Sequence, residues 1–115
     1  MTTSNSTRKY PLLGTHFVLD EEKILRENKY DLAKIYKAID EIANKCGMIK
    51  IDKNTYHCKG DENDLGCLGV FIHCNLLECD WFVKNVKEWQ WLSEKEGNLD
   101  IIEKERQKNN YIGVA

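Results

Sequence analysis

Histidine and cysteine side chains are concentrated in the middle of the sequence, where their types could bind a metal ion. They are His57, Cys58, Cys67, His73, Cys74 and Cys79. Zinc prefers imidazole and thiolate donors and takes four of them in a tetrahedron. The spacing does not favour such a site, because no C-x-x-C pair is present and neighbours in a strand point to opposite faces. We therefore interpret most of these cysteines as small core hydrophobes and expect no cofactor.

Two alternatives for this group stay open. His57 and His73 would share a face if their segments formed neighbouring strands, and Cys67 would join them in a zinc-binding module. Cys67 beside either histidine is also the pair that a small thiol enzyme would need, since a thiol nucleophile requires a nearby base. The common catalytic motifs, G-x-S-x-G, the P-loop, H-E-x-x-H and G-x-G-x-x-G, are absent from the chain, so an enzyme is not expected.

An acidic stretch follows the first histidine and contains Asp61, Glu62 and Asp64. It begins like a calcium loop, but Leu65 and Ile72 stand where that loop needs oxygen ligands, so we predict a solvated turn. Residues 47–80 hold three lysines against six acidic residues, a net charge of −3. An acidic surface of this kind suits a basic partner.

Three tryptophans lie close together, at positions 81, 89 and 91. Trp81 and Trp91 fall off the apolar stripe of a helix predicted over 76–92, and Leu92 lies beside them. A partly exposed tryptophan is the kind of side chain that dominates protein interfaces. The partner-binding residues predicted from these features are Trp81, Trp91, Leu92, Asp61, Glu62 and Asp64. The leading hypothesis is a protein-binding or regulatory protein of the immunity, inhibitor or adaptor type that docks onto an unidentified protein.

The first half of the chain predicts a short β-prone run at 15–19 and two helices, at 21–28 and 31–46. Apolar residues of the second helix recur at helical spacing from Leu32 to Cys46. Asp20 and Asp31 stand at the positions of N-caps, and Gly47 can end the second helix.

The second half begins with alternation of apolar and polar residues, which predicts a hairpin turning at Lys53-Asn54. Its register would place Ile49, Ile51, Tyr56 and Cys58 on one face. The unbroken apolar run 67–74 predicts a central strand buried on both faces, followed by the helix over 76–92 and a weaker helix after Asn98. The tail at 111–115 could add a strand or pack against the domain.

These elements predict an α+β domain in two layers. Its small three-stranded antiparallel sheet, with 15–19 as an optional N-terminal strand, would pack against three to four helices. Residues 1–9 would form a disordered tail, and 10–115 a single domain.

Composition excludes several classes of protein. The 115 residues carry a net charge of −2 and are 42% hydrophobic. No window is apolar enough for a membrane span, and no basic surplus suggests nucleic-acid binding. An odd number of cysteines without an apolar leader favours a cytoplasmic protein with reduced thiols. The composition is typical of small accessory proteins of bacteria and mobile elements, although no family is recognised and the oligomeric state is left unassigned.

Overall fold

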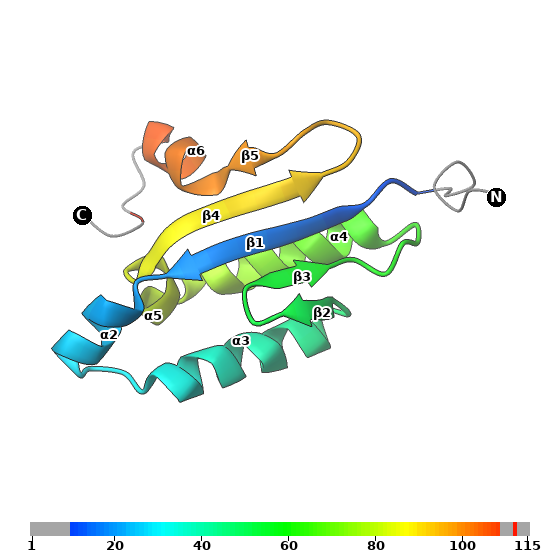
Figure 1. Cartoon of the computed structure of the whole chain (residues 1–115). Helices are drawn as coiled ribbons and strands as arrows, with labels where there is room; N and C mark the ends of the chain where they lie inside the picture. The colour runs from blue at the N-terminus through cyan, green and yellow to red at the C-terminus, as the bar shows by residue number, and fades with distance from the viewer. Residues whose placement is uncertain (1–9, 109–111, 113–115) are drawn as a thin grey trace.

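The computed structural model describes residues 10–108 and 112, so the tail predicted at 1–9 and most of the segment 111–115 lie outside the described residues. One antiparallel sheet of five strands runs through the domain in the order β2-β3-β1-β4-β5 (Figure 1). The strands are β1 (Leu13–Leu19), β2 (Ile49–Asp52), β3 (Thr55–His57), β4 (Val86–Ser93) and β5 (Leu99–Asp100).

Five α-helices accompany this sheet within the described residues. They are α2 (Glu21–Glu27), α3 (Leu32–Lys45), α4 (Asp64–Gly69), α5 (Asp80–Val83) and α6 (Ile101–Gln107). The helix that begins at α4 continues through a π-helical segment, η1 (Val70–Asn75), and a 3-10 turn, η2 (Leu76–Glu78). The strand β1 lies between β3 and β4, and a helical crossover precedes and follows the β2–β3 hairpin. This order of elements is the split βαβ, or ferredoxin-like, connectivity. The strand β5 and the helix α6 extend this arrangement at the β4 edge.

The core lies between the sheet and the two helical crossovers, and large aromatic rings fill its centre. Phe17, Tyr56 and Trp89 come from three adjacent strands and are at most 2% exposed. The ring of Phe82 meets those of Phe17 and Trp89 edge to face, at centroid distances of 5.4 and 4.7 Å. Edge-to-face contacts of this kind add to the free energy gained by burying the rings.

The predictions for the first half of the chain are confirmed. Both early helices are present, and the Oδ1 atoms of Asp20 and Asp31 accept hydrogen bonds from first-turn backbone N–H groups. Gly47 has φ +79°, the left-handed conformation that ends a helix easily at glycine. The run at 15–19 belongs to β1, which is the central strand of the sheet.

The predicted three-stranded sheet with three to four helices is wrong, and the run at 67–74 is one cause. This run is helical, because Leu68, Phe71, Ile72 and Leu76 repeat at helical spacing and each is 0% exposed. Val70, between them, is 46% exposed. A short, continuous apolar run fits a buried strand and a buried helix equally well, so its length alone could not decide.

The helix predicted over 76–92 is also wrong, since helical structure ends at Val83 and β4 follows. Trp89 and Trp91 lie on the helix-covered face, on either side of the exposed Gln90. Phe17 and Thr15 of β1 stand opposite these two tryptophans in the register. The apolar residues expected on one helix therefore belong partly to α5 and partly to β4. Those on β4 alternate with period two, as in a strand.

The β2–β3 hairpin turns where predicted but pairs in a different register. Ile49 stands opposite His57, Lys50 stands opposite Tyr56, and an irregularity follows between Lys50 and Asp52. Tyr56 is therefore buried on the helix side, whereas Ile49 and Ile51 are 46% and 52% exposed. A slip of one residue exchanges the two faces of a strand, which explains why the predicted common face is wrong.

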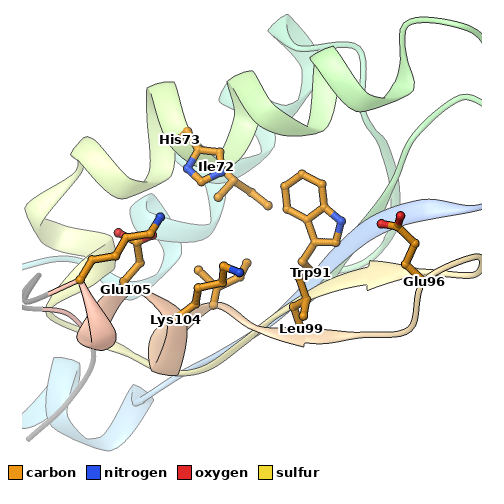
Figure 2. Close-up of a pocket in the computed structure, with 9 residues that line it drawn as sticks. Ile72, His73, Trp91, Glu96, Leu99, Lys104 and Glu105 are labelled. Atoms are coloured by element: carbon orange, nitrogen blue, oxygen red, sulfur yellow. The ribbon is translucent and has the colours of Figure 1, made fainter.

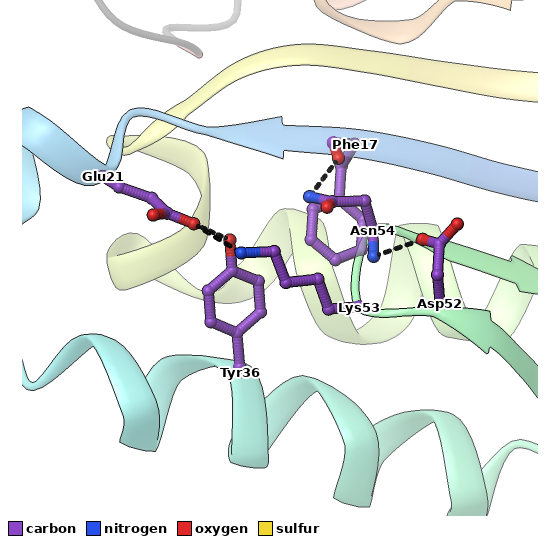
Figure 3. Close-up of polar contacts among 6 residues, drawn as sticks. All are labelled: Phe17, Glu21, Tyr36, Asp52, Lys53 and Asn54. Carbon is purple, nitrogen blue, oxygen red and sulfur yellow. Dashed lines mark hydrogen bonds and ion pairs between the residues drawn. The ribbon is translucent and has the colours of Figure 1, made fainter.

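A polar network fastens this hairpin to the helices (Figure 3). The Tyr36 hydroxyl of α3 donates to Glu21 Oε2 of α2 over 2.5 Å, and Lys53 Nζ lies 3.2 Å from the same oxygen. Asn54 Nδ2 donates to the backbone oxygen of Phe17 over 2.9 Å. The hydroxyl of Tyr36, with help from Lys53, holds the pKa of the Glu21 carboxyl below its ordinary value.

The backbones of β1 and β3 approach each other closely at Gly14. A Cβ atom at this position would stand 2.6 Å from the backbone oxygen of Tyr56 and 2.8 Å from a ring carbon of His57. Glycine within a strand often marks such an approach of backbone to backbone. The imidazole of His57 occupies the space that a side chain at Gly14 would need.

Candidate functional site: a groove at Trp91

A groove of about 250 Å³ lies between η1, the β4–β5 edge of the sheet and α6 (Figure 2). Its walls come from segments that are distant in the sequence. They are Ile72 and His73 of η1, Trp91 of β4, Glu96 of the β4–β5 loop, Leu99 of β5, and Ile101, Lys104, Glu105 and Lys108 at α6.

Trp91 forms the aromatic wall of this groove. Strand alternation places it on the same face as Trp89, whose indole is 1% exposed and donates to Thr15 Oγ1 over 3.0 Å. Trp91 lies two residues nearer the end of β4 and is only half-buried. The His73 ring lies 6.3 Å from the Trp91 ring, centroid to centroid, at an interplanar angle of 40°. Part of the Trp91 indole therefore remains available beside an imidazole.

The rest of this side of the groove is built by β5 and α6. Leu99 pairs with Trp91 in the sheet and is 48% exposed, while Ile101 is buried. The Oδ1 atom of Asp100 accepts a hydrogen bond from Glu103 N over 3.0 Å, which starts α6 directly after a strand of two residues. This cap turns the chain sharply, so that α6 borders the groove instead of continuing along the sheet.

Charged side chains stand around the apolar walls. Lys108 Nζ lies 3.3 Å from Glu105 Oε2, and the Glu105 side chain is 8% exposed. Lys104 is exposed and, in the part of the chain that the structure describes, has no ion pair. Glu96 stands on the β4–β5 loop at the opposite side of Trp91 (Figure 2). The groove thus has a positive end at α6 and a negative end at the loop.

Of the six residues predicted to bind a partner, the groove contains Trp91 alone. Trp81 lies on α5, half-buried, with its ring edge to face against Phe82 at 6.4 Å. Leu92 stands opposite Gly14 in the register and belongs to the sheet face away from Trp91. The structure therefore does not bring the three predicted apolar residues together.

The acidic stretch forms the turn that leads into α4. Asp64 is 5% exposed, and its Oδ1 atom accepts hydrogen bonds from the backbone N–H groups of Gly60 and Asp61. Asp61 Oδ1 accepts from the N–H group of Asn63 over 2.8 Å, while Glu62 is exposed. Two of the three predicted carboxylates thus shape the turn, and none of the three lines the groove.

The residues of the alternative metal site are separated. His57 lies on β3 beside Gly14, on the sheet face away from the helices, whereas His73 lies on η1. Cys67 Sγ stands next to Gly47 at the end of α3. Among residues 10–108 and 112, no three His, Cys, Asp or Glu side chains are grouped so that they could hold a metal ion.

All five cysteines are free thiols, in environments that differ widely. Cys58 is buried, and burial raises its pKa to about 12. Burial also raises the pKa of Cys46 and of Cys79, whereas Cys74 is exposed. The interpretation of cysteines as core residues therefore fits Cys58 well and does not fit Cys74.

Sequence reasoning missed most of the groove, including Ile72, Leu99 and Lys104. Leu99 was expected within the last helix, and Ile72 within a strand. No local pattern signals the groove, because its walls come from three segments whose meeting depends on the order of the strands.

No protein-family model matches the chain, and comparison with curated proteins and with solved structures gives no match. In the described part of the chain, no helix has both the length and the apolar character needed to cross a membrane.

Proposed function

We propose that the protein is a regulatory domain that docks onto a partner protein, in the manner of an immunity, inhibitor or adaptor protein, and that it does so through the groove at Trp91. The observation that carries the proposal is a half-buried Trp91 beside an exposed Leu99 in one apolar groove. Elsewhere on the same sheet face, Trp89 and Phe17 are closed off completely.

The size of the groove favours a protein side chain over a larger ligand. An apolar cavity of about 150 Å³ accepts a molecule as large as benzene. Sites for drug-sized ligands and cofactors usually measure about 300–1,000 Å³. A groove of about 250 Å³ therefore suits one large apolar side chain presented by a partner.

The chemistry of the groove also resembles the centre of a protein interface. An apolar centre within a polar rim is the usual anatomy of such interfaces, and tryptophan is enriched among the residues that dominate binding. Here Trp91, Leu99 and Ile101 form the apolar part, and lysine and glutamate side chains surround it.

Five free thiols support the further proposal that the protein works in a reducing compartment such as the cytoplasm.

Affinity capture with two matched variants tests this function. Leu99→Asp places a charge in the groove, and Leu65→Asp makes the same change on α4, where Leu65 is 65% exposed and outside the groove. Both positions are exposed, so both variants should fold, which circular dichroism checks. We expect the wild type and Leu65→Asp to retain a partner from a lysate of the source organism that Leu99→Asp loses. If all three proteins capture the same set of proteins, the groove is not the docking site.

A further inference from the structure

The charges around the groove indicate which charged group its partner presents there, provided that the groove is the docking site proposed above. At the α6 end, Lys108 already neutralises Glu105 through their 3.3 Å ion pair. Lys104 has no ion pair among the described residues, and its side chain projects towards the space beside Trp91 (Figure 2). This end of the groove therefore carries an uncompensated positive charge.

The apolar surface next to that charge has room for a single large side chain. Trp91 and Leu99 lie side by side in it, and Figure 2 shows His73 pointing into the same space from η1. The imidazole can donate a hydrogen bond, as can the ammonium group of Lys104. Glu96, at the other side of Trp91, would repel a carboxylate placed there. The two ends of a bound peptide segment would therefore meet opposite charges in the groove.

We infer that the partner presents a large apolar side chain with a carboxylate group directly beside it, as in a peptide where Leu, Phe or Trp neighbours Asp or Glu. The apolar side chain lies against Trp91 and Leu99, and the carboxylate lies at Lys104 and His73. This assignment differs from the basic partner that the acidic stretch of the sequence suggested, because that stretch does not border the groove.

A library of random dodecapeptides displayed on phage is the probe for this inference. After selection on the full-length wild-type protein, the enriched peptides are synthesised with a fluorescent label, and their affinities are measured by anisotropy. We expect the enriched sequences to share an acidic residue within two positions of Leu, Phe or Trp. We also expect Leu99→Asp to abolish their binding, whereas Leu65→Asp leaves it unchanged.

Charge reversal at Lys104 tests the role of the ammonium group. Lys104→Glu replaces attraction by repulsion, and for an exposed pair we expect affinity to fall by about five- to twentyfold. Lys37→Glu is the matched control, because Lys37 is an exposed residue of α3, near the opposite edge of the sheet, and does not line the groove. The loss with Lys104→Glu should also shrink in high salt, where exposed charges are screened.

The possible failures separate the two proposals. Peptides that lack an acidic residue, or that bind Lys104→Glu and Lys37→Glu equally, would overturn the inference about the carboxylate and leave the groove as docking site. Enriched peptides that bind Leu99→Asp as well as the wild type would overturn the docking site itself. Selection that enriches no peptide at all contradicts both.

Discussion

The hydrogen bond between Trp89 and Thr15 provides a sharp test of the pairing between β4 and β1. Trp89 Nε1 donates to Thr15 Oγ1 over 3.0 Å, and the Thr15 hydroxyl donates to the backbone oxygen of Gln90 over 2.7 Å. Thr15 is 0% exposed and Trp89 is 1% exposed, so no water can replace a lost partner. Thr15→Val keeps the shape of the side chain and leaves the indole N–H without an acceptor.

The size of the effect follows from this burial. A buried donor left without a partner costs about 1–3 kcal/mol, and we expect about 2 kcal/mol for Thr15→Val. With an unfolding entropy of about 2.1 cal/mol/K per residue, 115 residues give roughly 0.24 kcal/mol/K, so Tm should fall by about 8 °C. Urea unfolding at fixed pH measures the free energy, and calorimetry measures Tm.

Thr55→Val is the matched control for this experiment. Thr55 lies on β3, partly buried, and its hydroxyl contacts His16 Nδ1 over 2.8 Å on the sheet face away from the helices. Water can take over the hydrogen bonds there, so we expect a loss below about 1 kcal/mol. A loss for Thr15→Val no greater than for Thr55→Val would refute the reasoning. It would mean that Trp89 does not stand opposite β1 in a buried strand.

Three further predictions concern the glycines, a carboxylate and the thiols. Gly14→Ala should lower the free energy of unfolding by about 1–3 kcal/mol, because its Cβ would overlap the backbone of β3. Gly66→Ala, in open space on α4, should raise the free energy of unfolding by up to about 1 kcal/mol. Urea unfolding of both variants checks this prediction, and equal effects would contradict it. Glu21 has a folded pKa below its ordinary value of 4.5, so its charge stabilises the fold above that pH and this stabilisation is lost as pH falls through the folded pKa. The unfolding free energy of wild type should therefore exceed that of Glu21→Gln at pH 7, by less than about 1 kcal/mol because the side chain is 40% exposed. This difference should shrink as pH falls through the folded pKa of Glu21, and a difference that does not change with pH would count against the network. In a time course of alkylation followed by mass spectrometry, Cys74 should react first and Cys58 only after unfolding, and early labelling of Cys58 would be inconsistent with its burial.

Local signals of the sequence predicted the parts of the fold that depend on local physics. The caps at Asp20 and Asp31, the apolar stripe of α3 and the end of that helix at Gly47 are decided within a few residues of the chain. The turn at Lys53-Asn54 belongs to the same class.

The errors arose where two periodicities fit the same residues. The run around Phe71 has the composition of a buried strand, and only its packing against the sheet shows that it is a helix. The segment from Phe82 to Trp89 fits a helical stripe, although its end alternates as a strand beside β1. The first segment is a helix where a strand was predicted, and the second ends in a strand where a helix was predicted. These two differences change the strand count, the sheet order and the neighbours of every tryptophan.

The candidate site was predicted only through Trp91. The sequence placed Trp91 outside a helical stripe and left its exposure undecided, and its partial exposure arises from its position near the end of β4. Leu99 and Lys104 could not be associated with Trp91 from the sequence, because β5 and α6 reach the groove only through the pairing of β4 with β5.

The most direct test of the docking site uses the tryptophans themselves. Protein labelled with 5-fluorotryptophan gives one ¹⁹F resonance for each indole, at positions 81, 89 and 91, and single Trp→Phe variants assign them. On addition of the captured partner or an enriched peptide, the resonance of Trp91 should shift or broaden, and that of the buried Trp89 should change little. A change confined to Trp81, with the Trp91 resonance unmoved at saturation, would contradict the account.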